Sequence, residues 1–141
     1  MAYLIDTNVI CETIKPTPNA NVVKWFNSIA NEDLYISVLT LGEIRKGLEK
    51  INDLDKKRKI CLWLEQDLVS WFGERILSIN LDVANKWGIL CTETIKSTPV
   101  IDSLIASTAL QFDLILVTRN TKDFCYQGLE VINPFEIHSI T

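Results

Sequence analysis

The almost entirely apolar run Leu114–Thr118 constrains the fold more than any other feature of the sequence. A strand that helices cover on both faces is a continuous apolar run, whereas a strand with one solvent face alternates apolar and polar residues. Shorter β-forming runs occur at residues 3–5, 34–37, 75–79 and 130–132. Segments with helical spacing of apolar residues separate them. This alternation predicts an α/β fold with a mainly parallel central sheet flanked by helices on both faces.

Apolar residues at helical spacing predict several helices between these strands. They cover residues 7–14, 38–50 and 52–72, a segment that begins near Leu81, and a segment opened by Asp102. The prolines of residues 15–19 predict a turn, and the helix after it would be capped by Asn19 or Asn21. The sequence has no internal repeat and no linker, so residues 1–141 are predicted to form one domain.

The composition is that of an ordinary globular protein, with 48% hydrophobic and 23% charged residues. No window reaches the run of about 18 apolar residues that a membrane span needs. The N-terminus also lacks the basic region followed by an apolar region that marks a secretory signal. We therefore expect a cytoplasmic protein that makes no use of a membrane.

The cysteines, the histidine and the net charge narrow the kinds of site. The four cysteines are scattered without a CxxC pair, so we expect buried small hydrophobic residues rather than a disulfide framework. A single histidine, His138, argues against a histidine-built zinc site and against a Ser-His-Asp triad. The net charge of −4 argues against a surface that coats nucleic acid. It leaves room for an enzyme that acts on nucleic acid through a bound metal.

Four acidic residues fall where the predicted fold would bring them together. Asp6 follows the first strand, and Glu43 lies in the helix after the second strand. Asp102 opens the helix before the strongest strand, and Asp123 lies in the loop after that strand. In open parallel sheets, ligands bind beyond the carboxyl ends of the strands, so all four carboxylates could face one crevice. Neutral hydrogen-bonding residues at the same edge are Asn8, Thr118 and Asn120.

Each of these acids also has a purely structural interpretation. Asp6 and Asp102 could be helix N-caps, where aspartate is favoured. Glu43 could be a solvated helix residue, and Asp123 could be a turn residue. A cluster of carboxylates without a counter-charge is destabilising because like charges raise one another's pKa, and a bound divalent cation removes this conflict. Oxygen ligands without histidine or cysteine suit Mg²⁺ or Mn²⁺.

Four segments around these acids, taken together, resemble the PIN-domain family. They are Leu4–Ile10, Ser37–Ile44, Val100–Ala106 and Leu116–Phe124. The resemblance is to the VapC and FitB type in particular, the toxin half of bacterial type II toxin–antitoxin pairs, and it spans nearly the whole chain. It implies a PIN domain over residues 1–141. The metal-binding acids that it implies are Asp6, Glu43, Asp102 and Asp123, with Asn8, Thr118 and Asn120 as supporting residues.

The same resemblance implies a metal-dependent endoribonuclease that hydrolyses RNA phosphodiester bonds with metal-activated water. One or two Mg²⁺ or Mn²⁺ ions would serve as the cofactor, and cleavage would leave a 5′-phosphate and a 3′-hydroxyl. The implied partners are a cognate antitoxin that covers the crevice and a second copy of the chain in a homodimer. Arg119, beside the predicted site, is the candidate for contact with a substrate phosphate.

Two other functions are compatible with parts of the pattern. A haloacid-dehalogenase-like phosphatase also has an aspartate after its first strand, but it needs a second acid two residues later, where this chain has Asn8. A non-catalytic α/β module that binds RNA or protein is the second alternative. The basic residues within 45–50 and 56–59 could form a solvated helix face or a phosphate-tracking patch. We assign the four tryptophans to the core or an oligomer interface rather than to base stacking.

Overall fold

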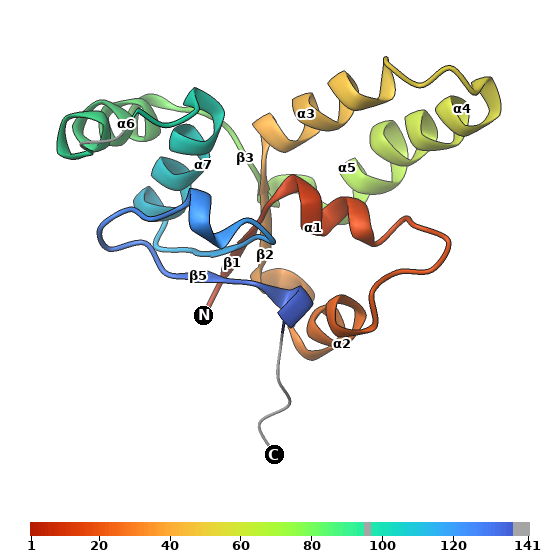
Figure 1. Cartoon of the computed structure of the whole chain (residues 1–141), viewed down its shortest axis with the longest axis horizontal. Coiled ribbons are helices and arrows are strands. Elements are labelled where there is room, and N and C mark those ends of the chain that lie inside the picture. Colours follow the sequence, from red (N-terminus) through yellow and green to blue (C-terminus); the bar gives the residue numbers. More distant parts are fainter. Residues whose placement is uncertain (95–96, 137–141) are drawn as a thin grey trace.

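The computed structural model describes residues 1–94 and 97–136 and has a five-stranded parallel sheet with helices on both faces (Figure 1). The strands are β1 (Tyr3–Ile5), β2 (Leu34–Ser37), β3 (Ile76–Leu77), β4 (Ile115–Val117) and β5 (Val131–Ile132). Their order across the sheet is β3-β2-β1-β4-β5. This arrangement confirms the predicted α/β fold, although β3 is shorter than the expected strand at 75–79.

The α-helices follow the strands in the expected order. They are α1 (Thr7–Glu12), α2 (Ala20–Ser28), α3 (Val38–Leu48), α4 (Leu54–Leu62), α5 (Val69–Phe72), α6 (Leu81–Glu93) and α7 (Val100–Gln111). In Figure 1, α6 and α7 lie on one side of the sheet, and α1 to α5 lie on the other. None of the helices within 1–94 and 97–136 has both the length and the apolar character of a membrane span.

The two central strands supply both halves of the hydrophobic core because successive side chains point to opposite faces of a sheet. Leu4 of β1 and Leu116 of β4 are buried in the cluster beneath α6 and α7. Their neighbours Ile5 and Val117 are buried in the other cluster, beneath α1 to α5. The continuous apolar run at 114–118 is therefore explained by burial on both faces. This burial places β4 beside β1, and the pairing of these two strands brings residues of the site together.

The helix predicted at 52–72 is interrupted by a π-helical segment, Trp63–Leu68, between α4 and α5. The buried residues of this region are Leu64, Leu68 and Phe72, at a constant spacing of four. In an α-helix, residues four apart are offset by about 40° around the axis, so the row drifts by about 80° over these three residues. The wider π turn offsets this drift and keeps the three side chains against the core.

Local capping also refines the expected helix starts. Asn19, and not Asn21, caps α2, since its Oδ1 accepts hydrogen bonds from the backbone N–H groups of Asn21 and Val22. The expected start of a helix at Asp102 is wrong by two residues, because α7 begins at Val100 after Pro99. Asp102 therefore lies in the first turn of α7 and is not its N-cap.

The expectation that the cysteines are buried is wrong. Cys11 and Cys61 are partly exposed, and Cys91 and Cys125 are exposed; all four are free thiols. Cys91, for example, follows the buried Leu90 in α6, and a step of about 100° around the helix turns it towards solvent. His138 lies outside the described residues.

The tryptophans pack as expected on the core side of the fold. Trp25 is buried, and its ring meets those of Tyr3 and Phe26 edge to face, at centroid distances of 5.2 and 5.1 Å. Trp63 and Trp71 pack against the same cluster. These three rings contribute to the core, which agrees with the assignment to the core or an oligomer interface, although Trp63 and Trp71 are only partly buried.

Candidate functional site

Asp6 stands at the centre of the candidate site, directly after β1. Its side chain is only 8% exposed. Oδ1 accepts a hydrogen bond from the backbone N–H of Thr7 (2.9 Å), and Oδ2 accepts one from the hydroxyl of Thr118 (2.8 Å). Asp6 is thus the N-cap of α1 and, at the same time, a carboxylate held between two strands. The structural interpretation of Asp6 and the functional one are both compatible with this geometry.

Thr118 ties the end of β4 to Asp6. Its fully buried hydroxyl donates to Asp6, accepts the backbone N–H of Asn120 (3.1 Å) and lies 3.4 Å from Nδ2 of Asn8. Asn8 in turn accepts the backbone N–H of Arg119 at 3.1 Å. The three predicted supporting residues therefore form one hydrogen-bonded group, in which Asn120 takes part through its backbone.

We expect Thr118→Val to weaken metal binding about 10–100-fold, since losing a residue that orients a ligating carboxylate has this effect. The substitution keeps the side-chain volume but removes the donor to Asp6. Isothermal titration of the purified protein with Mn²⁺ measures the change. Thr108→Val is the matched control, because Thr108 is equally buried and its hydroxyl donates only to the carbonyl of Leu104 within α7. Equal affinities for the two variants would contradict the role of Thr118.

Glu43 reaches the same edge of the sheet from α3. Its Oε1 accepts a short hydrogen bond (2.6 Å) from the hydroxyl of Thr7, the first residue of α1. Glu43 is partly buried, so it is not the solvated helix residue of the structural interpretation. Thr7 is a residue of the site that the sequence did not identify. A threonine between an aspartate and an asparagine is a helix-start pattern, and its distant partner is known only from the packing of α1 against α3.

The resemblance implies RNA cleavage, and Thr7→Val should lower the rate of this cleavage about tenfold. The variant should leave α1 intact, because the backbone N–H that Asp6 caps is retained. The expected size is that of one lost hydrogen bond to a charged group. Initial-rate cleavage measurements at fixed Mn²⁺ provide the test. Thr13→Val, at the other end of α1, removes a hydroxyl that donates only to the carbonyl of Ile10 and should leave the rate unchanged. A Thr7 variant as fast as this control would show that Glu43 needs no such support.

Asp102 and Asp123 complete the group of acids. Asp102 is partly buried in the first turn of α7, and Asp123 is exposed at the end of a short 3₁₀ turn after β4. Burial raises the pKa of Asp102 above its ordinary value, and the negative charges of Asp6, Asp123 and Glu43 raise it further. The structure therefore brings the other three predicted acids within electrostatic reach of Asp102.

The pKa of Asp6 is raised as well, and its main cause is also burial. Burial raises the pKa of Asp6, and the hydrogen bonds from Thr118 and Thr7 offset part of this effect. Within residues 1–94 and 97–136, no three histidine, cysteine, aspartate or glutamate side chains close around a single point. A cation that neutralised the carboxylates would remove the repulsion between them and let them approach.

The donor atoms of the site suit a hard divalent cation. The acids offer carboxylate oxygens, and a sulfur on the same helix belongs to Cys11, which lies one turn further along α1. Burial raises the pKa of the Cys11 thiol to about 11, with smaller contributions from Glu43 and Asp6 that exceed the opposing effect of Lys15. A thiol in this state stays protonated at neutral pH and is neither a soft metal ligand nor a nucleophile. An oxygen-only set is what Mg²⁺ and Mn²⁺ prefer.

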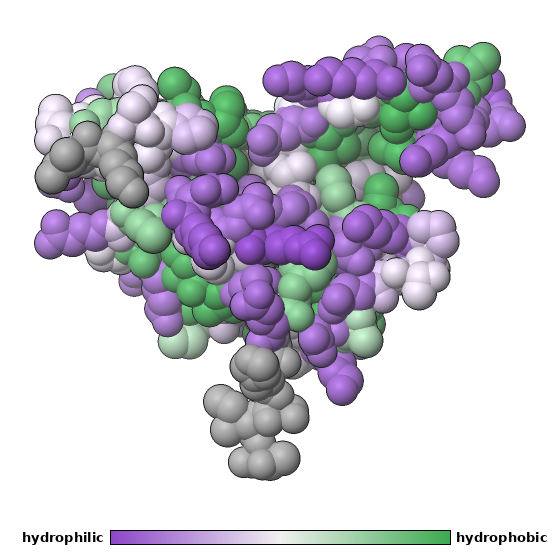
Figure 2. All heavy atoms as spheres, in the orientation of Figure 1, coloured by the Kyte–Doolittle hydropathy of each residue, from purple (hydrophilic) through white to green (hydrophobic). Residues whose placement is uncertain are grey.

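The site opens on a hollow between the two helical halves of the molecule. Val38, Leu39 and Glu43 of α3 and Ile101 of α7 line one cavity of about 480 Å³, to which Glu43 contributes a carboxylate. In Figure 1 these two helices begin close to each other above the end of β1, and Figure 2 shows the surface hollowed there, with a hydrophilic rim on the α3 side. A long, flexible polar substrate could reach the acids through this opening.

The basic residues near the opening are of two kinds. Three of them form ion pairs: Arg45 with Glu49 and Glu65, Lys57 with Glu49, and Arg58 with Asp55. Such pairs are typical of a solvated helix face. Lys46 and Lys50 instead line the cavity that holds Glu43. These two lysines are the better placed part of the basic cluster for contact with a phosphate backbone.

Arg119 lies next to the hydrogen-bonded group around Thr118, and no acid among the described residues forms an ion pair with it. Its guanidinium lies over the ring of Phe135, with 4.5 Å between Cζ and the ring centroid. The residue is exposed, and its backbone N–H is the part that contacts Asn8. The stacking on Phe135 uses the face of the guanidinium, so the N–H groups at its edge can bind an anion.

Comparison with known proteins places this arrangement in a family. The family model described as "PIN domain" matches residues 3–126, a range that includes all four acids. The chain belongs to the PIN-domain family. The Toxin FitB of Neisseria gonorrhoeae is 36% identical over 135 residues, covering 94% of this PIN domain and 97% of that toxin. The VapC ribonuclease Y4jK of Sinorhizobium fredii is 32% identical and covers 94% and 97% of the two chains.

Solved structures agree with the sequence comparisons. The crystal structure of FitAcB from Neisseria gonorrhoeae matches 96% of this PIN domain and 99% of that chain, with a TM-score of 0.87 and 35% identity. The structure of FitAB bound to an IR36 DNA fragment matches 99% of both chains, with a TM-score of 0.87 and 32% identity. The resemblance to the VapC and FitB type is thereby confirmed for both the sequence and the fold.

Proposed function

We propose that this PIN domain is the toxin ribonuclease of a type II toxin–antitoxin pair, and that Asp6, Glu43, Asp102 and Asp123 hold the divalent metal on which RNA hydrolysis depends. One observation carries the proposal. Burial raises the pKa of Asp102, and the charges of the other three acids raise it further, so three carboxylates from three other segments lie within electrostatic reach of Asp102. Relatives named as VapC ribonucleases support RNA hydrolysis as the activity.

The proposed role of each residue follows from its burial and its hydrogen-bond partners. Asp6 and Asp102 would bind the metal directly, and Glu43 and Asp123 would bind it directly or through water. When bound, Mg²⁺ or Mn²⁺ supplies an activated water and stabilises the charge on the leaving oxygen. Thr118 and Thr7 hold Asp6 and Glu43 in place. Lys46, Lys50 and Arg119 would position the substrate phosphates.

The hydrogen bonds of Asn8 argue against the phosphatase alternative. A haloacid-dehalogenase-like phosphatase would need a general acid at this position. Here the side chain of Asn8 accepts the N–H of Arg119 and directs Nδ2 towards Asp6 and Thr118. It has no proton to transfer at neutral pH. A non-catalytic binding module would have no need for four coupled acids.

The remaining parts of the proposal concern assembly. Solved relatives are complexes of a toxin with an antitoxin, among them a VapBC2 complex from Rickettsia felis bound to a promoter DNA fragment. We propose that this PIN domain likewise binds a cognate antitoxin, forms a homodimer and acts on RNA in the cytoplasm. The domain would extend over residues 1–141, beyond the matched range. Size-exclusion chromatography with light scattering tests the dimer.

The activity is tested with protein freed of any partner and incubated with a pool of structured RNAs in Mg²⁺, Mn²⁺ or EDTA. We expect discrete fragments only with metal. We also expect the new 5′ ends to resist labelling by polynucleotide kinase until phosphatase has removed a 5′-phosphate. Cleavage that persists in EDTA would contradict the metal-dependent mechanism. Metal binding without cleavage of any RNA in the pool would favour the binding-module alternative.

A further inference from the structure

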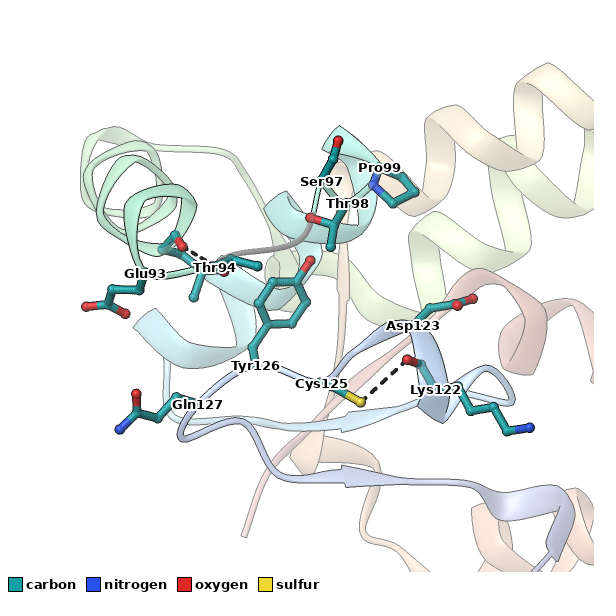
Figure 3. Close-up of a pocket in the computed structure, with 11 residues that line it drawn as sticks. Glu93, Thr94, Ser97, Thr98, Pro99, Lys122, Asp123, Cys125, Tyr126 and Gln127 are labelled. Atoms are coloured by element: carbon teal, nitrogen blue, oxygen red, sulfur yellow. Dashed lines mark hydrogen bonds between the residues drawn. The ribbon is translucent and has the colours of Figure 1, made fainter.

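We propose that a groove beside Asp123 binds one nucleobase of the RNA and that the hydroxyl of Tyr126 reads the edge of this base. The inference rests on the proposed ribonuclease function, which it deepens from RNA in general to a base-specific subsite. Figure 3 shows the groove, with Asp123 at one end and Tyr126 in the middle.

The groove consists of two adjoining hollows of about 470 and 370 Å³. Residues common to both are Leu90, Thr94, Ser97, Thr98 and Tyr126. The first hollow extends to Lys122 and Asp123, and the second extends to Trp87 and Ser103. The end of α6, the 97–99 loop and the segment after β4 thus enclose a space that begins at one of the four acids.

Tyr126 is the feature that points to a ligand. Its side chain is 7% exposed, and its ring is packed in the core beneath α6 and α7. The phenolic oxygen is buried and has no hydrogen-bond partner among the described residues. In Figure 3 it points towards the loop of Ser97 and Thr98, into the space that both hollows share. A buried hydroxyl without a partner is unfavourable, and a ligand that pairs with it removes this penalty.

Three other polar groups in the groove have partners inside the protein. The hydroxyl of Thr94 donates to the carbonyl of Leu90, and the indole N–H of Trp87 donates to Ser103. The thiol of Cys125 faces the carbonyl of Lys122. This contrast singles out Tyr126 as the hydrogen-bonding group that a ligand would meet in the depth of the groove.

The charges around the groove favour a neutral ligand over a phosphate. Among the described residues that line the first hollow, Glu93 and Asp123 carry carboxylates and Lys122 carries a positive charge. Glu93, which is not one of the proposed metal ligands, would repel a phosphate, whereas a nucleobase is uncharged. Proteins that recognise single-stranded RNA unstack bases and hydrogen-bond their edges beside apolar and aromatic side chains. Leu90 and the ring of Tyr126 provide such surroundings next to the reacting phosphate.

The test compares Tyr126→Phe with the wild-type protein. The variant removes only the hydroxyl, so we expect its melting temperature to be unchanged or slightly raised. Tyr3→Phe is the matched control, because Tyr3 lies at the start of β1 and packs against Trp25 in the opposite core cluster. Cleavage products of a random RNA pool are sequenced to give the base preference at each position around the cut. We expect Tyr126→Phe to lose about tenfold in selectivity for one base at one position, the effect of a single hydrogen bond.

Binding is measured separately, so that failure of the subsite differs from failure of the ribonuclease. The wild-type protein and both variants are irradiated in EDTA with random RNA carrying 4-thiouridine, and the adducts are mapped by mass spectrometry. We expect adducts on the peptides that contain Leu90–Thr94 or Cys125–Gln127 whether or not the protein cleaves RNA. Adducts confined to other surfaces, an unchanged base preference, or a lowered melting temperature of Tyr126→Phe would each overturn the proposal.

Discussion

Replacing Asp6 with asparagine should lower the rate of RNA cleavage by about 1,000-fold or more. The expected size follows from a metal's contribution of several kcal/mol to stabilising the transition state, since each 1.4 kcal/mol is a factor of ten. Asparagine keeps the shape of the side chain and an oxygen that can cap α1, so the fold should be retained. The loss would therefore come from the missing charge. Initial rates at saturating Mn²⁺ provide the measurement.

The matched control for this experiment is Asp67→Asn. Asp67 is an exposed aspartate in the π-helical segment and takes no part in the site. Its replacement changes the net charge by the same amount and should leave the cleavage rate within about twofold, as is usual for surface substitutions. A residual activity of Asp6→Asn close to that of Asp67→Asn would mean that Asp6 acts only as the N-cap of α1.

Asp102→Asn should have two opposite effects. It should lower the rate of RNA cleavage about as much as Asp6→Asn does, and it should raise the stability of the metal-free protein. The folded pKa of Asp102 is raised, so folding is disfavoured by its ionisation. This penalty is absent below the ordinary pKa of 3.8 and is fully present once the pH exceeds the raised value. In EDTA at pH 7, the substitution should raise the melting temperature by about 2–4 °C.

Thermal unfolding at several pH values tests this account of Asp102. The gain in melting temperature should shrink as the pH is lowered towards 4, because the wild-type carboxyl then becomes protonated as well. Addition of Mn²⁺ should stabilise the wild-type protein more than the variant. A melting temperature that falls on substitution in EDTA would show instead that the carboxylate supports the start of α7.

The fold could be predicted because its central strands carry their own signal. Residues 114–118 are apolar on both faces, and the acids follow the strands at positions where a parallel sheet gathers them. The order of elements then placed Asp6 and Asp123 near each other. The interruption of the helix at 63–68 was not predictable in this way, since it depends on keeping residues four apart against the core.

The support of the site depends on contacts between distant segments, and the sequence did not reveal it. The hydrogen bond from Thr7 to Glu43 joins residues 36 positions apart and exists only because α1 packs beside α3. Nothing in the sequence distinguishes Tyr126, and only the placement of its neighbours shows that its hydroxyl has no partner among the described residues. The exposed cysteines were misjudged because composition alone does not say which side of a helix faces solvent.

The most direct test of the central claim is a calorimetric titration of partner-free protein with Mn²⁺. It compares the wild type with Asp6→Asn, Glu43→Gln, Asp102→Asn and Asp123→Asn, and it uses Asp67→Asn as the control. We predict saturable binding by the wild type and the control, and at least tenfold weaker binding by each of the four variants. Binding that is unaffected by these four substitutions, or no binding by the wild type, would contradict a shared metal centre.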